Sequence, residues 1–264
     1  TLLYSVLKKA LESCHLPAAA VGFIASAKRE SVAELLQQDE YVDLLIPRGG
    51  EELQRRCRRE ARMPVITGGF GISHIFVDES CEVARAVPLI INAKVQNPSA
   101  CNALDTLLVH EKVAGALFKL LLPELEKFKV RLFAHGAAYA RCGDYPYLEK
   151  GSDEDFKREF LSLAMNVAEV ADVKQAAAHL RRVGANHSDA ILTDSRAHAD
   201  YFCHRAGSAC VYVNASPRFT DGGQFGLGAE VAISTQKLHA RGPLALEELT
   251  TYQYVGEGDY LARA

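Results

Sequence analysis

The residue best suited to covalent chemistry in this 264-residue chain is Cys101. It follows a polar turn at Asn97-Pro98 and precedes an apolar run, 104–109, whose short length and β-branched end predict a buried strand. A cysteine on a loop at the mouth of a strand is held in place yet open to substrate, which suits a thiolate nucleophile. We therefore expect Cys101 to be the most reactive of the seven thiols. The competing interpretation is a small core residue, the commoner place for a single cysteine.

Glycines indicate a second kind of chemistry, the binding of a nucleotide. Gly49-Gly50 stands between a predicted strand, 42–46, and a predicted helix, 51–62, where free backbone N–H groups can meet a phosphate or a nicotinamide. In parallel α/β sheets ligands bind outside the carboxyl ends of the strands, and this pair lies at such an end. Gly68, Gly69 and Gly71 interrupt the next predicted strand, 64–78, and mark either a bulge or a place where another group approaches the backbone closely. A plain tight turn is the alternative, because the chain contains no GxGxxG motif.

A long polar, glycine-rich loop, 214–230, carries groups that can bind anions. Composition alone leaves open whether it is a functional loop or a flexible surface connection. Arg218 in this loop has a guanidinium group, which pairs bidentately with carboxylate or phosphate, and Ser216 adds a hydroxyl donor. His239 and Arg241 are in a similar position farther along the chain. A solvated side chain is the alternative for each arginine.

The composition is that of a globular protein, with 48% hydrophobic residues, 24% charged residues and a net charge of −3. This charge favours neither nucleic acid nor a membrane surface as a partner, and no apolar stretch is long enough for a membrane span. Seven cysteines, an odd number without regular spacing, argue against a disulfide framework and for a reducing cytoplasm. Because neither CxxC nor HExxH spacing occurs, we expect no metal site.

Helical and strand patterns alternate along most of the chain, which predicts a parallel, right-handed α/β fold. The chain opens inside a helical pattern without a capping residue, so residue 1 is not expected to be a natural domain start. Region 134–152 looks the least ordered, and 250–255 has the strong β propensity of an exposed edge strand. The other expected strands cover 20–25, 130–133, 163–170, 190–193 and 210–213, and the other expected helices cover 31–38, 81–93, 112–127, 172–184 and 195–206.

Four stretches of the sequence resemble gamma-glutamyl phosphate reductases, which are members of the aldehyde dehydrogenase superfamily. The stretches occur in the order found in that family, and the resemblance covers essentially the whole chain. They are Asp-Leu-Leu-Ile-Pro-Arg-Gly-Gly at 43–50, Ser-Ala-Cys-Asn-Ala-Leu-Asp-Thr-Leu-Leu-Val-His at 99–110, Val-Asn-Ala-Ser-Pro-Arg-Phe-Thr-Asp at 213–221, and Phe-Gly-Leu-Gly-Ala-Glu at 225–230 followed by Ile-Ser-Thr-Gln-Lys-Leu-His-Ala-Arg-Gly-Pro at 233–243.

The resemblance implies an α/β fold like that of aldehyde dehydrogenases, with parallel sheets, flanking helices and a cofactor domain that is truncated at its N-terminus. It divides the chain into a partial nucleotide-binding domain at 1–78, a catalytic thiol domain at 79–244 and a C-terminal oligomerisation segment at 245–264. The missing segment would hold the adenosine end of the nucleotide. The choice between NADP and NAD is therefore left open, with NADPH the cofactor that the resemblance favours.

The activity implied is the second step of proline biosynthesis, the NADPH-dependent reduction of L-glutamyl 5-phosphate to L-glutamate 5-semialdehyde and phosphate through a cysteine thioester. The resemblance assigns catalysis to Cys101 and Asn102, whose backbone N–H groups are available to a tetrahedral oxyanion. It assigns the cofactor to Arg48, Gly49, Gly50, Gly68 and Glu159, with a surface glutamate as the alternative for the last. It assigns the substrate to Ser216, Arg218, His239 and Arg241.

Two other functions remain open. One is a truncated, non-catalytic scaffold or subunit of the same fold, and the other is a different acylating aldehyde dehydrogenase. The family also implies a homo-oligomer, dimer or tetramer, in the cytoplasm, and it is compatible with functional coupling to a glutamate 5-kinase. The stretch 64–77 contains no carboxylate where ordinary aldehyde dehydrogenases have a general base. We therefore expect phosphate, and not water, to be the acyl acceptor in the reverse reaction.

Overall fold

The computed structural model describes residues 1–68 and 71–263, which form two compact units. The smaller unit combines residues 1–45 with 55–65, and the larger one combines 46–54 with the chain from 66 onward. All the residues with a predicted chemical role belong to the larger unit. Gly69, part of the glycine pattern in the predicted strand 64–78, lies outside the described residues.

The smaller unit is mainly helical. Its buried residues include Leu36 and Cys57, and its only strand-like contact in the described chain is a single parallel bridge between Leu45 and Val65. The predicted strand 20–25 is wrong, because no described backbone segment runs beside it to form a hydrogen-bonded ladder. The predicted strand 42–46 is reduced to the bridge for the same reason. The helical elements are α1 (Leu2–Ser13), η1 (Ala18–Ala20), α2 (Arg29–Leu35) and α3 (Glu51–Glu60), the last of which begins in the larger unit.

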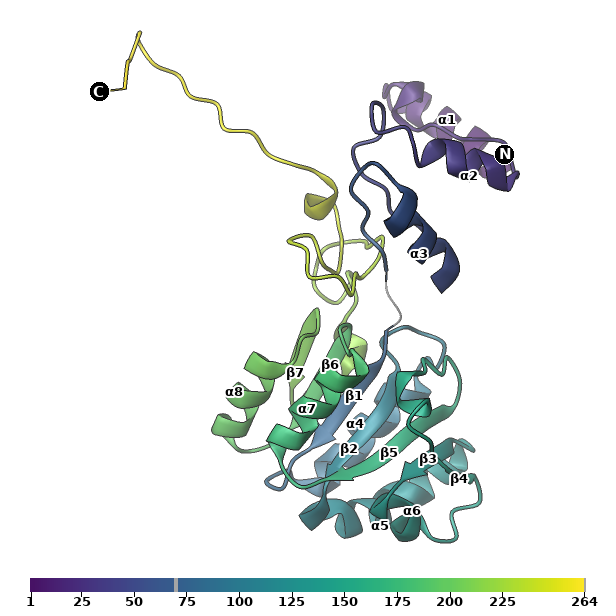
Figure 1. The fold of residues 1–264 in the computed structure, drawn as a ribbon, viewed down its shortest axis with the longest axis vertical. Helices are drawn as coiled ribbons and strands as arrows, with labels where there is room; N and C mark the ends of the chain where they lie inside the picture. Colours follow the sequence, from purple (N-terminus) through teal and green to yellow (C-terminus); the bar gives the residue numbers. More distant parts are fainter. Residues whose placement is uncertain (69–70, 264) are drawn as a thin grey trace. The chain divides into compact units, whose positions relative to one another are not determined.

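The larger unit is built around one seven-stranded sheet in which every neighbouring pair of strands is parallel (Figure 1). The strand order is β4-β3-β5-β2-β1-β6-β7. This arrangement confirms the parallel α/β fold with flanking helices that the alternating sequence pattern predicts. The strands are β1 (Ser73–Val77), β2 (Leu104–His110), β3 (Arg131–His135), β4 (Leu148–Lys150), β5 (Ala164–Val170), β6 (Ser188–Leu192) and β7 (Cys210–Val213).

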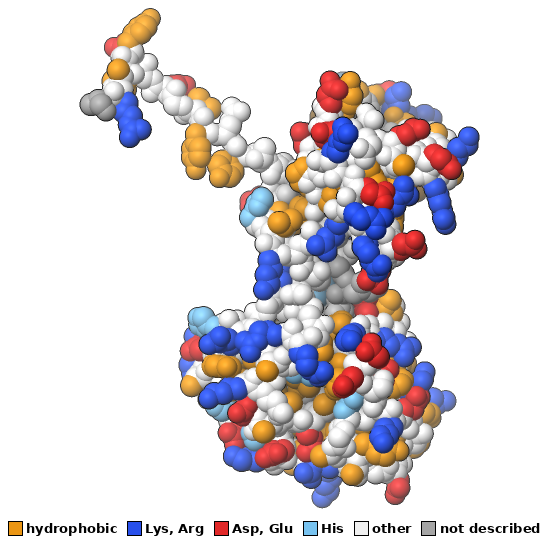
Figure 2. Space-filling view, in the orientation of Figure 1, with side chains coloured by type: hydrophobic (Ala, Val, Ile, Leu, Met, Phe, Trp, Pro, Cys, Tyr) orange, Lys and Arg blue, Asp and Glu red, His pale blue; other side chains and the backbone are white. Residues whose placement is uncertain are grey.

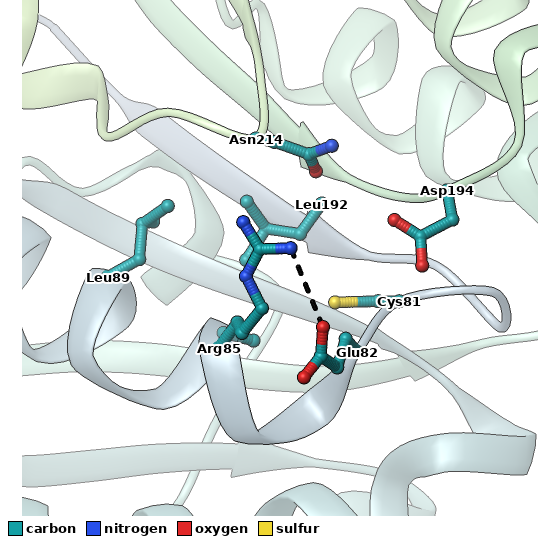
Figure 3. Close-up of a pocket in the computed structure, with 8 residues that line it drawn as sticks. Cys81, Glu82, Arg85, Leu89, Leu192, Asp194 and Asn214 are labelled. Atoms are coloured by element: carbon teal, nitrogen blue, oxygen red, sulfur yellow. Dashed lines mark ion pairs between the residues drawn. The ribbon is translucent and has the colours of Figure 1, made fainter.

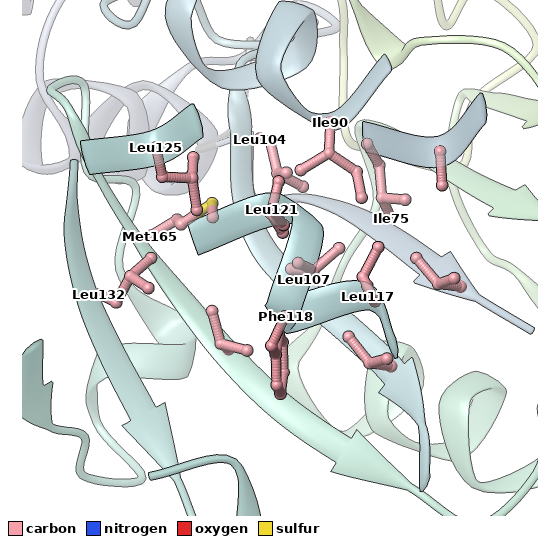
Figure 4. Packing of buried hydrophobic residues seen from close by; sticks show 14 of the residues in the cluster. Ile75, Ile90, Leu104, Leu107, Leu117, Phe118, Leu121, Leu125, Leu132 and Met165 are labelled. Carbon is pink, nitrogen blue, oxygen red and sulfur yellow. The ribbon is translucent and has the colours of Figure 1, made fainter. Parts of the chain in front are cut away.

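Helices cover both faces of the sheet, and alternate strand residues point to opposite faces. On one face Ile75 and Leu107 pack in a large core with α4, α5 and α6 (Figure 4). On the other face Phe76 and Leu108 pack with α7 and α8, which include Phe202. These helices are α4 (Val83–Val95), α5 (Glu111–Lys127), α6 (Ala137–Cys142), α7 (Val173–Val183) and α8 (Arg196–Arg205), and the short turns are η2 (Asp155–Lys157), η3 (Pro217–Phe219) and η4 (Glu247–Leu249).

Local signals in the sequence locate several helix ends correctly. Asp172 caps α7 by accepting a hydrogen bond from the Gln175 N–H at 2.7 Å, and Gly184 ends the helix with a left-handed φ of 76°. Region 134–152, which looked least ordered, is instead regular, since it contains α6 and β4. The predicted strand 64–78 is too long, because β1 begins only at Ser73, where the chain reaches its sheet neighbours.

After β7 the chain leaves the sheet. The segment 250–263 contains no helix or strand and is exposed throughout (Figure 1). No helix in the described part of the chain is both long and apolar enough to cross a bilayer. On the face shown in Figure 2, basic and acidic side chains are interspersed over the sheet-containing unit, in keeping with the small net charge.

Candidate active site

Cys101 lies at the amino end of β2, and the segments around it come from the same edge of the sheet. Gly71 precedes β1, Glu159 precedes β5, and His187 precedes β6. The rule that ligands bind at the carboxyl ends of parallel strands therefore does not hold for this site. The reason is that Gly71, Cys101, Glu159 and His187 all lie in loops that enter the central strands.

The backbone of Cys101 is held by a very close approach of Gly71. A Cβ atom on Gly71 would lie 2.5 Å from the Cys101 carbonyl oxygen and 2.8 Å from Cδ2 of His187, so only glycine fits. The Ser73 hydroxyl also lies 3.5 Å from that oxygen. The thiol itself is on an exposed residue, as the predicted nucleophile requires.

The carboxylates of Glu159 and Glu230 affect the pKa of the Cys101 thiol. Partial burial raises the pKa of Cys101, the charges of Glu159 and Glu230 raise it further, and the Arg218 guanidinium lowers it. A raised pKa means that a smaller fraction of the Cys101 thiol is ionised near neutral pH. Cys14, the other exposed thiol among the described cysteines, lacks this surrounding and competes with it for simple alkylating reagents.

Glu159 owes its position to Asp105, a residue that the sequence analysis did not single out. The Asp105 carboxylate is buried in β2 and accepts hydrogen bonds from the N–H groups of Ser73 at 3.3 Å and Phe160 at 3.0 Å. Burial raises its pKa to about 6, while the buried Lys94 ammonium works in the opposite direction. Burial and the charge of Asp105 in turn raise the pKa of Glu159 to about 7. Two segments that flank Cys101 are thus tied to one carboxylate.

Asn102 fastens the loop 214–230 to the cysteine. Its side-chain Nδ2 donates to the carbonyl of Thr220 at 2.8 Å and lies 3.4 Å from that of Arg218. Thr220 is itself held by the hydroxyls of Ser188 at 2.6 Å and Tyr212 at 2.8 Å. The Asn102 side chain therefore positions the loop, which leaves its backbone N–H as the group available to an oxyanion.

The four residues predicted to bind substrate have different surroundings. Ser216 is buried and caps η3, since its hydroxyl accepts from the Arg218 N–H at 3.3 Å. Arg218 donates from Nε to Oε1 of Gln96 at 3.1 Å, and its remaining guanidinium donors have no carboxylate partner among the described residues. Arg218, which is partly exposed, therefore presents free donors to a ligand, whereas the Ser216 hydroxyl is buried.

His239 and Arg241, the other two residues predicted to bind substrate, do not contact the segment around Cys101 in the described part of the chain. The Arg241 guanidinium donates to the backbone carbonyls of Asn186, at 3.1 Å, and Gly207, and burial lowers its pKa. His239 is exposed, and none of the contacts of the described residues involves its ring. Arg241 is thus engaged with backbone of the same unit, and neither side chain is brought to Cys101.

Arg48, one of the predicted cofactor residues, acts electrostatically on Glu230, which in turn acts on the Cys101 thiol. The Arg48 charge lowers the pKa of Glu230, which burial raises, and Glu230 acts on Cys101. A Cβ on Gly68 would lie 3.8 Å from Nη1 of Arg48. Glu230 also accepts from the Gly222 N–H at 2.9 Å and so closes the loop. It was missed as a site residue, although it ends one of the four family-like stretches.

Gly49 and Gly50 differ in how strongly the backbone requires them. Gly49 has a φ of 154°, and a Cβ there would lie 2.8 Å from Cδ2 of Leu53. Gly50 has open space around it and lies directly before α3. The pair leaves the helix N-terminus free of side chains, as the predicted nucleotide contact needs.

A separate cavity of about 190 Å³ lies at the opposite edge of the sheet, beyond the carboxyl ends of β1 and β6 (Figure 3). It contains the Cys81 thiol, but burial, followed by the charge of Asp194, raises the pKa of that thiol to about 11. None of the predicted site residues lines it. In the described part of the chain no cluster of histidine, cysteine or acidic side chains is arranged to hold a metal ion.

Comparison with known proteins supports the same reading of the chain. A model of the aldehyde dehydrogenase family matches residues 1–135. The gamma-glutamyl phosphate reductase of Tolumonas auensis is 54% identical over 264 residues, which make up 99% of this chain and 63% of that protein. That of Photobacterium profundum is 54% identical over 262 residues, with the same two shares. The chain thus spans about 63% of the length of these curated relatives.

Solved structures with folds similar to this chain point to the same family. The gamma-glutamyl phosphate reductase of Thermotoga maritima, 42% identical, matches with a TM-score of 0.91 across 99% of this chain and 62% of its own. An acetylating aldehyde dehydrogenase of Geobacillus thermoglucosidasius reaches a TM-score of 0.69 over 97% of this chain and 66% of its own at 15% identity, which shows a common fold. These similarities confirm the resemblance indicated by the four sequence stretches.

Proposed function

Because the chain belongs to the aldehyde dehydrogenase family, we propose that it carries the catalytic thiol of a gamma-glutamyl phosphate reductase. The proposed reaction is the reduction of L-glutamyl 5-phosphate to L-glutamate 5-semialdehyde and phosphate, a step of proline biosynthesis. The observation that supports it most is the setting of Cys101. An exposed thiol, whose backbone is fixed by Gly71 and whose pKa responds to the charges of Glu159, Glu230 and Arg218, lies within a stretch shared with relatives of that name.

The residues present fit a nicotinamide cofactor, which supplies hydride when bound. Glu159 has a pKa of about 7, so near neutral pH its carboxyl group can accept from or donate to a ribose hydroxyl. The unencumbered backbone at Gly50 and the exposed Arg48 suit an anionic group at the start of α3. We propose NADPH as the cofactor, with NAD not excluded.

The chain's own residues account for the acyl transfer. The Cys101 thiolate attacks the acyl carbon, a C–S bond forms, and the bond from that carbon to the phosphate oxygen breaks, so that phosphate leaves with its electron pair. The thiol proton passes to solvent, to which Cys101 is open. Backbone N–H groups at Cys101 and Asn102 are the proposed donors to the oxyanion. After reduction, loss of the thiolate from the thiohemiacetal releases the semialdehyde.

The segment before β1 explains why water would be a poor acyl acceptor. Thr67, where an ordinary aldehyde dehydrogenase would carry a carboxylate base, is buried. Its N–H donates to Oε1 of Gln236 at 2.6 Å, and its carbonyl accepts from the Ser234 hydroxyl at 2.7 Å. A threonine hydroxyl does not act as a base near neutral pH. Without a base the thioester should hydrolyse about 100- to 10,000-fold more slowly.

The test is the oxidation of glutamate 5-semialdehyde with NADP⁺, measured with and without inorganic phosphate. We expect oxidation that depends on phosphate, is lost in Cys101→Ser, and is accompanied by very weak esterase activity. The Tolumonas auensis relative is assayed in parallel as the reference. An equal rate without phosphate would show that another residue activates water, and preference for coenzyme A as acceptor would indicate another acylating dehydrogenase.

We also propose that the chain self-associates through its C-terminal segment. Residues 250–255 combine high β propensity with an exposed backbone, and Tyr254 is 92% exposed. Such a segment can add to the edge of another sheet.

A further inference from the structure

A small cavity of about 230 Å³ lies beside η3, where the C-terminal end of α4 approaches the loop 214–230. Taking about 30 Å³ for each water molecule, it holds roughly the volume of seven waters. That is enough for the five heavy atoms of an amino-acid head group. Its walls are formed by Asn92, Gln96, Arg218, Phe219, Asp221 and Gln224.

The cavity contains one basic and one acidic side chain that do not pair with each other. Arg218 is anchored through Nε to Gln96, which leaves its other guanidinium donors for a ligand. Asp221 accepts from the Gln224 N–H at 3.0 Å through Oδ1. Within the described residues neither side chain has an oppositely charged partner at salt-bridge distance. The two charges are therefore available to a ligand that carries both signs.

The remaining walls are neutral. The side-chain amides of Asn92, Gln96 and Gln224 offer both donors and acceptors, so they can complete the hydrogen bonds of an ammonium or a carboxylate group. Phe219 adds an apolar ring that can cover a methylene chain. The cavity also adjoins the end of α4, which stops at Val95, and the C-terminal end of a helix favours a positive charge such as an ammonium group.

The loop that lines this cavity is linked to the segment of the Cys101 thiol. The Arg218 charge lowers the pKa of Cys101, which shows that the guanidinium lies within electrostatic range of the sulfur. Asn102, the residue after the cysteine, donates to the Thr220 carbonyl at 2.8 Å, directly before Asp221. The same loop thus carries both charges and is tied to the catalytic segment.

We propose that the cavity binds the amino-acid end of the substrate, with Arg218 pairing with the α-carboxylate and Asp221 with the α-ammonium group. This inference rests on the proposed function and identifies the part of the site that selects an α-amino acid. Asp221 becomes a specificity-determining residue, because a carboxylate there favours substrates with an ammonium group over those without one.

The experiment measures the dissociation constants of L-glutamate, glutarate and 4-aminobutyrate for the chain by calorimetry. Glutarate lacks the α-ammonium group, and 4-aminobutyrate lacks the α-carboxylate. We expect L-glutamate to bind most tightly. In Asp221→Asn the new side-chain Oδ1 can still accept from Gln224. This change should weaken the binding of L-glutamate about tenfold or more and leave the dissociation constant of glutarate unchanged. Arg218→Gln should weaken L-glutamate and glutarate by a similar factor and leave 4-aminobutyrate unchanged.

Asp144→Asn, a change at an exposed carboxylate outside the cavity, is the matched control and should alter none of the constants. Thermal melting confirms that each variant is folded. The proposal is overturned if L-glutamate does not bind at millimolar concentration, or if Asp221→Asn preserves the ratio between L-glutamate and glutarate. A different outcome is that the unaltered chain prefers L-glutamate to glutarate as expected and yet shows no acyl transfer. That result would refute the proposed reaction and leave the amino-acid site standing.

Discussion

Replacing Gly71 by alanine should damage the site more than its small size suggests. The added methyl group would lie 2.5 Å from the Cys101 carbonyl oxygen, whereas ordinary contacts of this kind begin at 3.4 Å. On its other side it would meet the His187 ring at 2.8 Å. That ring is buried and bonded through Nδ1 to the Ser188 hydroxyl at 2.9 Å, so it cannot swing away without breaking a hydrogen bond. The backbones of residue 71 and Cys101 must therefore separate by about 0.9 Å, the difference between 3.4 and 2.5 Å.

Two magnitudes follow from this displacement. Overpacking of this kind costs about 1–3 kcal/mol of unfolding free energy, and in a chain of this size each kcal/mol lowers Tm by about 2–4 °C. A misplacement of about 1 Å at a reacting centre costs on the order of 100-fold in rate. We therefore expect Gly71→Ala to melt several degrees lower and to accept an acyl group from an acyl phosphate about 100-fold more slowly.

The assay follows acylation of Cys101 by intact-protein mass spectrometry and unfolding by circular dichroism. The control is Gly115→Ala in α5, where the nearest atom to the new methyl group is 3.9 Å away. Alanine at this exposed helical position should raise stability by about 0.5–1 kcal/mol and leave acylation unchanged. If Gly71→Ala melts like the unaltered chain and is acylated at the same rate, the close approach of Gly71 to Cys101 does not exist.

Three further predictions concern the surroundings of the thiol and the end of the chain. Glu159→Gln removes a negative charge that raises the pKa of Cys101, so alkylation of Cys101 at pH 8 should be faster. The control is Glu154→Gln, a change at an exposed carboxylate. An unchanged rate of Cys101 alkylation in Glu159→Gln would contradict the electrostatic coupling. Arg218→Ala should leave Tm nearly unchanged, since the contact of Arg218 with Gln96 is exposed. It should weaken the binding of an anionic substrate analogue, measured by calorimetry, by about 1.5–3 kcal/mol. Lost stability with intact binding would reverse the assignment. Deletion of 250–264 should reduce the mass measured by light scattering, and an unchanged mass with an intact fold would count against association through this segment.

Several features of this protein can be predicted from its sequence because they depend on neighbours in the chain. The strand after Cys101, the capped helix from Asp172 to Gly184 and the strands predicted at 163–170, 190–193 and 210–213 follow from local periodicity and capping, and the structure confirms them within a few residues. Cys101 could be singled out because its loop, its following strand and the family-like stretch are contiguous. Its exposure agrees with that prediction.

Other features depend on contacts between distant segments. The predicted strand 20–25 had the right composition, but a strand needs a hydrogen-bonding partner, and the described chain supplies none there. Asp105 looked like one polar residue in an apolar run, and only folding brings its carboxylate to the N–H groups of Ser73 and Phe160. Glu159 and Glu230 act on Cys101 although 58 and 129 positions separate them from it in the sequence. The proposal of Cys101 as the nucleophile therefore rests on local sequence, whereas the charges and contacts around its thiol are decided by the tertiary structure, because electrostatic and steric effects act through space and not along the chain.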